Sequence, residues 1–188
     1  MIYLIRHMQS EANRRNIWGG DYPLTDLGIQ QAQKVKKQID FVPDILVAST
    51  LRRARQTAQL LFPKRKIITD ATFREINFGN REDTLVLDDK YTRAYDTNPS
   101  QLHKLTHGDV MADRAQKAIA KMLEYQEQGK VVAIVCHDTL MRAILCTLKG
   151  EHLDNMPKYK PLFINGAILK IDLPCTMEVT NLLGTTKL

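Results

Sequence analysis

The sequence predicts an α/β protein with three layers, in which a mostly parallel central sheet is covered by helices on both faces. Strand-like and helix-like patterns alternate along the whole chain, and such alternation is typical of parallel sheets. The run VVAIVC at residues 131–136 is apolar throughout, as expected for a central strand that is buried on both faces. With 188 residues, of which 44% are apolar, the chain fits one domain over residues 1–188.

The first half of the chain supplies two predicted strands and two predicted helices. Residues 2–5 form a short apolar strand. Thr25 is a suitable N-cap for a helix that continues to residue 39, with one face made by Gly28, Ala32, Val35 and Ile39. A second short strand is expected over residues 44–49. The helix after it ends before Pro63, and its apolar face is made by Leu51, Ala54, Ala58 and Leu61.

The second half begins with a polar segment and then returns to strands and helices. Residues 80–108 are polar and show no clear period, so we expect an excursion over the surface. A long helix follows, with Ala115, Ala118, Ile119 and Met122 at helical spacing. After the strand at 131–136, Asp138 is the expected N-cap of a helix that ends near Gly150. Residues 164–171 and 177–179 close the chain as strands.

The composition favours an anionic partner without indicating a nucleic acid. The formal net charge is +6, from 27 basic and 21 acidic residues, but the basic residues are dispersed along the chain. No apolar run approaches a membrane span, and the N-terminus lacks the pattern of a signal peptide. Cys136, Cys146 and Cys175 contain no CxxC pair, which favours free thiols in a reducing compartment. We therefore expect a cytoplasmic protein without a membrane partner, and the sequence leaves its oligomeric state open.

Charged and histidine side chains follow three of the predicted strands. Arg6 and His7 follow the first strand, His137 follows the apolar strand, and Ser49 ends another strand just before Arg53. Because ligands of open α/β sheets bind at the carboxyl ends of the strands, these side chains are expected to share one crevice. Two arginines and two histidines suit an anion such as phosphate. Nearby positive charge also keeps a histidine neutral, as a nucleophile requires.

Each of these residues also has an ordinary explanation when it is taken alone. Arg6 and His7 could face solvent at the end of a strand. Arg53 could pair with a neighbour such as Asp44, and His137 could be a satisfied histidine. His103 and His107 are four residues apart, but no third ligand accompanies them, so we expect neither a metal nor another cofactor.

Five segments in order resemble the histidine phosphatase superfamily, in its phosphoglycerate-mutase-like branch. The first, RHMQSEAN, is similar to the family motif RHG-x-[ST]-x-x-N. The others are PLTDLGIQQA, STLRRARQTA, FREINFGNRE and IVCHDTLMRAIL, at residues 23–32, 49–58, 73–82 and 134–145. The resemblance spans roughly residues 2–148, and it is the order of all five segments that makes it specific.

The resemblance implies a phosphatase mechanism on a small phosphorylated substrate. His7 is then the nucleophile that becomes phosphohistidine, and Glu75 is the acid that protonates the leaving oxygen, which requires a raised carboxyl pKa. The residues implied to hold the phosphoryl group are Arg6, Arg53, His137 and Asn13. Ser10 and Asp138 complete the expected substrate-binding set. No metal is required, because the arginines supply the positive charge.

Several departures from the family pattern keep two other functions open. Met8 replaces a glycine after the nucleophile, so a side chain is expected where the backbone is usually bare. Asp138 replaces a glycine after the second histidine, and as an N-cap it would compete with phosphate for helix amides. Arg81 stands in place of a tryptophan. These changes fit a non-catalytic module that binds a phosphorylated ligand. A phosphoglycerate mutase is the other alternative, although the short chain favours the compact phosphatase type.

Overall fold

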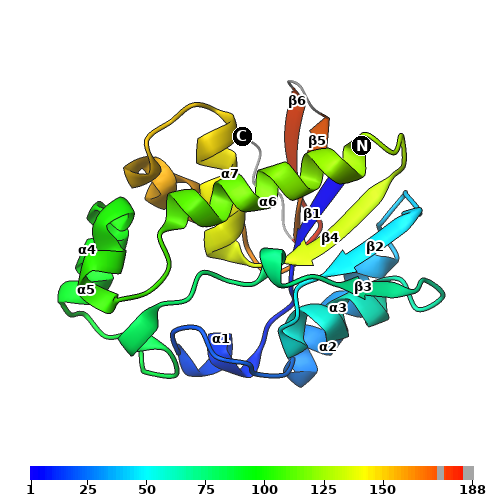
Figure 1. The fold of residues 1–188 in the computed structure, drawn as a ribbon. Coiled ribbons are helices and arrows are strands. Elements are labelled where there is room, and N and C mark those ends of the chain that lie inside the picture. The colour runs from blue at the N-terminus through cyan, green and yellow to red at the C-terminus, as the bar shows by residue number, and fades with distance from the viewer. Residues whose placement is uncertain (173–175, 184–188) are drawn as a thin grey trace.

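The computed structural model describes residues 1–172 and 176–183 and contains a mixed six-stranded sheet (Figure 1). Four strands are parallel to their neighbours and two are antiparallel at one edge. In spatial order the strands are β3 (Ile67–Thr69), β2 (Ile45–Ala48), β4 (Val132–Cys136), β1 (Ile2–Arg6), β5 (Ala167–Asp172) and β6 (Thr176–Asn181). The predicted mostly parallel sheet is therefore confirmed, and β4 lies inside it between β2 and β1.

Helices cover both faces of the sheet. The pair α2 (Asp26–Lys36) and α3 (Arg52–Leu61) packs on one face, and α6 (Met111–Gln126) and α7 (Asp138–Leu148) pack on the other. Side chains of β4 alternate between the two apolar clusters: Val132 and Ile134 join the α6–α7 side, whereas Ala133 and Val135 join the α2–α3 side. Because both faces are covered, this strand is apolar at every position.

The predicted elements agree with the structure apart from small shifts at their ends. The helix capped by Thr25 ends at Lys36 rather than at residue 39, and Thr25 Oγ1 accepts the amide of Gly28 as expected. The helix that was expected to end near Gly150 is α7, and it ends at Leu148. The edge strand β3 was not predicted from the sequence, because its three residues are too few to show a period, although two of them are isoleucines.

The excursion over residues 80–108 contains helices that the sequence did not predict. This region contains helical segments, namely α4 (Lys90–Thr97), η3 (Pro99–Gln101) and α5 (Leu102–Thr106). The helix α4 begins at Asp89, whose carboxylate accepts the amides of Tyr91 and Thr92. These helices are too short to show an apolar period, and α4 has no fully buried residue.

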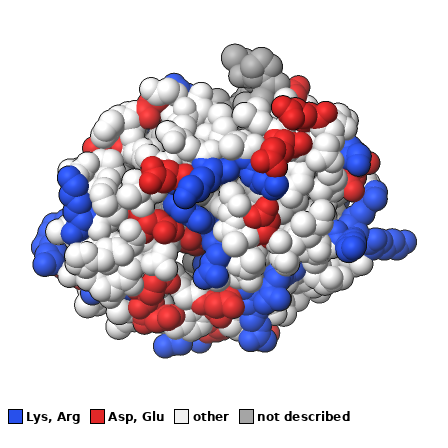
Figure 2. Space-filling model, viewed as in Figure 1, with Lys and Arg blue, Asp and Glu red and all other residues white. Residues whose placement is uncertain are grey.

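The segments at the carboxyl ends of the parallel strands enclose one side of the molecule. Besides α4 and α5 they include α1 (Glu11–Arg15), η1 (Ala71–Phe73), η2 (Gly79–Arg81) and η4 (Leu153–Leu162). On the face seen in Figure 2, basic and acidic side chains lie interspersed. Within the described residues, no helix has both the length and the apolarity needed to cross a membrane. Cys136 and Cys146 are free and buried, and Cys175 lies outside the described residues.

Candidate active site

The predicted convergence of side chains at the ends of β1, β2 and β4 is present. Arg6 is the last residue of β1, and the amide of His7 donates to the carbonyl of Cys136 at 3.0 Å, so β1 and β4 end side by side. The Nε of Arg53, in the first turn of α3, lies 3.0 Å from His7 Nε2. The rings of His7 and His137 have centroids 5.0 Å apart.

The hydrogen bonds of His7 define its tautomer. Its Nδ1 lies 2.7 Å from the carbonyl oxygen of Met8, which can only accept, so Nδ1 carries the proton. The Nε2 atom is therefore unprotonated and accepts from Arg53 Nε. Burial, followed by the charges of Arg53 and Arg6, holds the pKa of His7 well below its usual value. His7 is consequently a neutral imidazole with its Nε2 lone pair directed at an arginine.

His137 lies behind this pair and is fully buried, with 0% of its surface exposed. Its Nε2 is 2.8 Å from Ser49 Oγ, at the end of β2. Burial and the charge of Arg53 hold the pKa of His137 well below its ordinary value. His137 Nδ1 and Arg6 Nε are buried without a hydrogen-bond partner among the described residues. These two atoms therefore have hydrogen-bonding capacity that the described residues do not use.

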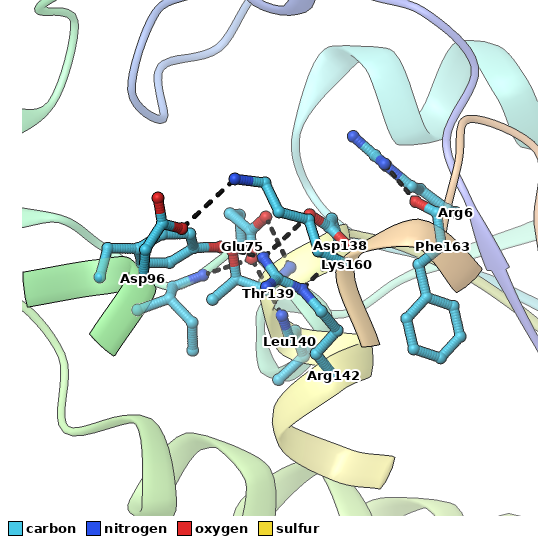
Figure 3. Close-up of polar contacts among 11 residues, drawn as sticks. Arg6, Glu75, Asp96, Asp138, Thr139, Leu140, Arg142, Lys160 and Phe163 are labelled. Atoms are coloured by element: carbon cyan, nitrogen blue, oxygen red, sulfur yellow. Dashed lines mark hydrogen bonds and ion pairs between the residues drawn. The ribbon is translucent and has the colours of Figure 1, made fainter. Parts of the chain in front are cut away.

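The two arginines are held by backbone carbonyls. An Nη1 atom of Arg6 donates to the carbonyl of Phe163 (Figure 3), and Arg53 Nη1 donates to the carbonyl of Gly20 at 2.5 Å. Neither arginine has a carboxylate salt-bridge partner among the described ion pairs, and Asp44, the suggested neighbour of Arg53, accepts the amide of Val131 instead. Their charges therefore act on the two histidines.

A pocket of about 280 Å³ opens in front of these residues. Its lining includes seven of the eight residues that the sequence predicts for the site: Arg6, His7, Ser10, Asn13, Arg53, Glu75 and Asp138. The eighth, His137, does not line it and contacts the site through the His7 ring. The pocket also contains side chains that the sequence reasoning missed, namely Tyr95, Thr139, Arg142, Lys160 and Asn165.

Glu75 meets the first turn of α7 (Figure 3). Its Oε2 accepts the amide of Thr139 at 3.2 Å, and its Oε1 accepts the amides of Leu140 at 3.1 Å and Ile76 at 3.0 Å. Burial raises the pKa of Glu75, and the negative charge of Asp138 raises it further, whereas the amides and Arg53 oppose the rise. The net direction is upward, as a carboxyl that must carry a proton near neutral pH requires.

Asp138 is not the N-cap of α7, contrary to the sequence expectation. The N-cap residue is His137, without a side-chain cap, and Asp138 is the first helical residue. The Asp138 carboxylate accepts from Arg142 Nε at 3.1 Å and Arg142 Nη2 at 3.0 Å. The helix amides go to Glu75 instead, because Arg142 lies one turn along the same helix and holds Asp138 away from them. Competition between Asp138 and phosphate for these amides is therefore not supported.

Met8 does not project into the pocket, which also corrects an expectation. Its side chain is fully buried, at 0% exposure, in the apolar cluster between the sheet and α2–α3. Only its backbone serves the site: the carbonyl accepts from His7 Nδ1, and the amide donates to Thr57 Oγ1 at 3.1 Å. The replacement of glycine at this position thus fills the core rather than the site.

Ser10 and Asn13 form a capping box at the start of α1. The Ser10 side chain accepts the amide of Asn13, while Asn13 Oδ1 accepts the amide and the hydroxyl of Ser10. Asn165 connects this loop to His7, because its Nδ2 donates to the carbonyl of His7 at 2.9 Å and lies 3.3 Å from Asn13 Oδ1. Ser10 and Asn13 line the pocket, and their hydrogen bonds also fix the shape of the loop.

Tyr95 and Lys160 were missed because their segments show no apolar period, whereas the spacing of Arg142 from Asp138 was a weak indication in the sequence. Tyr95 lies on α4, and Lys160, on η4, pairs with Asp96 at 3.3 Å (Figure 3). Arg142 stands four residues after Asp138, which is the spacing of a helical ion pair. That spacing was visible in the sequence and could have indicated their contact.

Comparison with known proteins agrees with this geometry. The profile of the histidine phosphatase superfamily, branch 1, matches residues 2–174. A Hydrogenobacter thermophilus protein, named for a suggested phosphoserine phosphatase activity, is 30% identical over 167 residues, which cover 82% of this chain and 81% of that protein. A Yersinia pestis protein, GpmB, named for a suggested phosphoglycerate mutase activity, is 29% identical over 161 residues, which cover 79% and 74% of the two chains.

Solved structures extend the comparison to the fold. Phosphoserine phosphatase of Entamoeba histolytica, in a mutant bound to phosphoserine, superimposes with a TM-score of 0.78 at 22% identity, covering 96% of this chain and 94% of that chain. The same enzyme with 3-phosphoglyceric acid gives a TM-score of 0.77 at 26% identity, covering 89% and 88% of the two chains. Since the family profile spans most of the chain, this protein belongs to branch 1 of the histidine phosphatase superfamily.

Proposed function

We propose that this protein hydrolyses a small phosphomonoester through a phosphohistidine intermediate on His7. The observation that carries the proposal is the hydrogen bonding of His7, whose Nδ1 donates to Met8 and whose unprotonated Nε2 faces Arg53. A nucleophile at phosphorus needs such a lone pair, and its anionic target needs nearby positive charge.

In the first step His7 Nε2 attacks phosphorus, and the bond to the leaving oxygen breaks. Arg6 and Arg53, which line the pocket, stabilise the charge on the phosphoryl oxygens. His137 Nδ1 is buried behind His7 and has no partner among the described residues, so it can donate to a phosphoryl oxygen only once the substrate has displaced the side chains in front of it, in the tautomer that leaves its Nε2 as the acceptor from Ser49. Glu75 gives its proton to the leaving oxygen. In the second step Glu75, now ionised, takes a proton from the water that attacks the phosphohistidine.

The substrate that we propose is a small phosphorylated metabolite. The pocket volume of about 280 Å³ suits a phosphate with a short organic group, rather than a phosphorylated protein or nucleic acid. The relatives support phosphoserine and phosphoglycerate as the first compounds to test, because their names and bound ligands contain these two molecules. We further propose that the protein acts in the cytoplasm, in agreement with the buried free thiols of Cys136 and Cys146.

The test begins with p-nitrophenyl phosphate in excess chelator, with vanadate as inhibitor. We expect turnover that persists in chelator and is lost in His7→Ala, while the matched control His152→Ala, at an exposed histidine, keeps it. Protein quenched in alkaline detergent should carry a phosphoryl group that acid releases and that is absent from His7→Ala. Turnover that survives in His7→Ala, or that chelator abolishes, would refute the mechanism.

Glu75 is tested by the leaving group. In Glu75→Gln, transfer from an alkyl phosphate should slow by about 10²–10⁴-fold, while transfer from p-nitrophenyl phosphate changes far less, because nitrophenolate leaves without a proton. Pre-steady-state bursts measure this first step directly. Equal losses for the two substrates would assign Glu75 a structural role.

The same assays separate the two other functions. A mutase would interconvert the two phosphoglycerates rapidly in the presence of a bisphosphate primer and would hydrolyse them slowly. The name of the Yersinia relative is the observation that keeps this candidate. A binding module would bind vanadate without turnover of any of these phosphates.

A further inference from the structure

A buried salt bridge stands beside Glu75 in the first turn of α7. The side chain of Arg142 is 1% exposed, and two of its nitrogen atoms contact the two carboxylate oxygens of Asp138 at 3.1 and 3.0 Å. Such a two-point contact fixes the position of the carboxylate as well as its charge. The proposed reaction gives neither residue a role, although both line the pocket.

The two carboxylates at this helix start are bound by different groups. The amides of Thr139 and Leu140 donate to Glu75, which comes from a segment more than sixty residues earlier in the chain. Asp138 is nearer in sequence and would ordinarily take such amides itself. Its contact with Arg142 removes it from that competition, so Glu75 keeps the amides and its place at the pocket.

The contact with Arg142 leaves the negative charge of Asp138 fixed next to the buried carboxyl group of Glu75. After burial, Asp138 is the strongest influence that raises the pKa of Glu75. Arg142, if it stood alone, would act in the opposite direction, because a cation favours the ionised form of a nearby carboxyl. The effect on Glu75 therefore depends on both members of the pair.

We infer that Asp138 and Arg142 are positioning residues that together set the proton affinity of Glu75 for the leaving group: Asp138 raises it by its charge, and Arg142 holds that carboxylate in place and limits the rise. The inference rests on the proposed role of Glu75 as the acid. It does not require either residue to touch the substrate.

Tyr95 anchors the pair from α4. Its hydroxyl accepts from Arg142 Nη2 and lies 2.9 Å from Thr139 Oγ1. Burial raises the pKa of Tyr95 to about 12, so this partner stays neutral over the working range. The other ionisable groups around Glu75 include the neutral His7 and His137 and the thiol of Cys136. The charged residues that line the same two cavities are Arg6, Arg53, Asp96 and Lys160 in the pocket, and Asp21, Arg74, Glu82, Asp83, Asp109 and Arg114 in the adjoining cavity.

Two single variants should move the titration of Glu75 in opposite directions. Asp138→Asn removes the negative charge and leaves Arg142 unpaired, so the pKa of Glu75 should fall. Arg142→Gln leaves Asp138 uncompensated and free to take the helix amides, so the pKa of Glu75 should rise. The double variant Asp138→Asn/Arg142→Gln removes both charges, and its titration should lie between those of the single variants. A disturbance of folding alone would not produce this order.

The experiment follows the side-chain ¹³C carboxyl signal of Glu75 through a pH titration, with the signal assigned by its absence in Glu75→Gln. The second readout is the alkaline limb of kcat/KM for β-glycerophosphate, with p-nitrophenyl phosphate as the internal control. At pH values above the lowered pKa of Glu75, Asp138→Asn should reduce the ratio of kcat/KM for β-glycerophosphate to that for p-nitrophenyl phosphate by about tenfold or more, within the range that a positioned acid contributes. Arg142→Gln should move the same limb to higher pH.

The outcomes separate this inference from the proposed function. Unchanged Glu75 titrations in both single variants, or shifts in the same direction, would overturn the inference. If an unpaired Arg142 prevents Asp138→Asn from folding, the inference is still tested by the other two variants, because the pKa of Glu75 should be higher in Arg142→Gln than in the double variant. A Glu75→Gln protein that keeps its alkaline limb would instead overturn the assignment of the acid, and the carboxyl titration would still show whether the pair controls Glu75.

Discussion

Replacement of Met8 should reduce stability and leave catalysis almost intact, because the structure buries this side chain away from the pocket. Met8 has no exposed surface and packs in the cluster that includes Leu24, Ala32 and Ile168. A Cβ built on Gly166 would already lie 3.0 Å from Met8 Sδ, which shows how closely the backbone of the next segment approaches it. Met8→Ala would therefore leave a cavity, because the neighbouring Gly166 has no side chain that could fill it.

The expected loss follows from that cavity. Truncation of a buried methionine to alanine costs about 2–5 kcal/mol of the free energy of unfolding. For a chain of this length, about 1 kcal/mol changes Tm by about 2–4 °C, so Met8→Ala should melt roughly 5–15 °C lower. Met8→Leu keeps most of the volume and should cost less than about 1.5 kcal/mol. Because the backbone contacts of residue 8 with His7 and Thr57 survive in both variants, kcat should stay close to that of the wild type.

Thermal melting and vanadate inhibition, measured on the same preparations, check this reasoning. The expected result is a large change in Tm for Met8→Ala with an unchanged inhibition constant. If Met8→Ala instead keeps its Tm and binds vanadate about tenfold more weakly or more tightly, a difference of about 1.4 kcal/mol, the side chain faces the ligand and its placement in the core is wrong.

Three further predictions concern the support of the site. His7 and His137 are neutral and buried, so the unfolded chain binds protons near pH 6.5 that the folded protein does not. The free energy of unfolding should therefore decrease as the pH is lowered below about 6.5, by at most about 1.4 kcal/mol per pH unit for each histidine. In urea unfolding His7→Gln should show a smaller decrease than the wild type, and equal slopes would contradict the prediction. Gly28→Ala should lower Tm although alanine favours helices, because its Cβ would lie 2.1 Å from the carbonyl oxygen of Gln9; an increase in Tm would show that the loop yields. Asn165→Ala should lose about 1 kcal/mol of unfolding free energy and reduce kcat more than it raises KM, measured by steady-state kinetics; a change in KM alone would mean that Asn165 binds substrate.

The convergence of the proposed catalytic side chains could be predicted from the sequence because it depends on strand ends. Arg6, His7 and His137 directly follow or end apolar strands, and parallel strands bring their carboxyl ends to one edge of the sheet. Arg53 follows by the same reasoning from the start of the next helix. For these residues the local sequence is sufficient, because a residue at the end of a parallel strand, or at the start of the helix that follows it, lies at that edge of the sheet.

The distal half of the pocket could not be predicted in this way. Tyr95 and Lys160 lie on short helical segments whose packing is set by contacts rather than by an apolar period. The direction of the Met8 side chain depends on the close approach of Gly166, a residue far along the chain. These side-chain positions depend on tertiary contacts, so no spacing in the sequence predicts them.

Asp138 shows most clearly why a sound local rule can fail. An aspartate at a helix start is a good N-cap, and the spacing to Arg142 was the one sign in the sequence of another partner. Two contacts decided the outcome: Glu75, from a distant segment, brings a carboxylate to the same amides, and Arg142, one turn along the helix, offers Asp138 a two-point contact. The cap of α7 is thus supplied by the proposed acid itself. Because these amides both begin the helix that follows His137 and hold Glu75 at the pocket, the segment of the acid and the segment of the second histidine form one structural unit. A substitution that loosens the first turn of α7 should therefore displace the acid before it displaces the nucleophile.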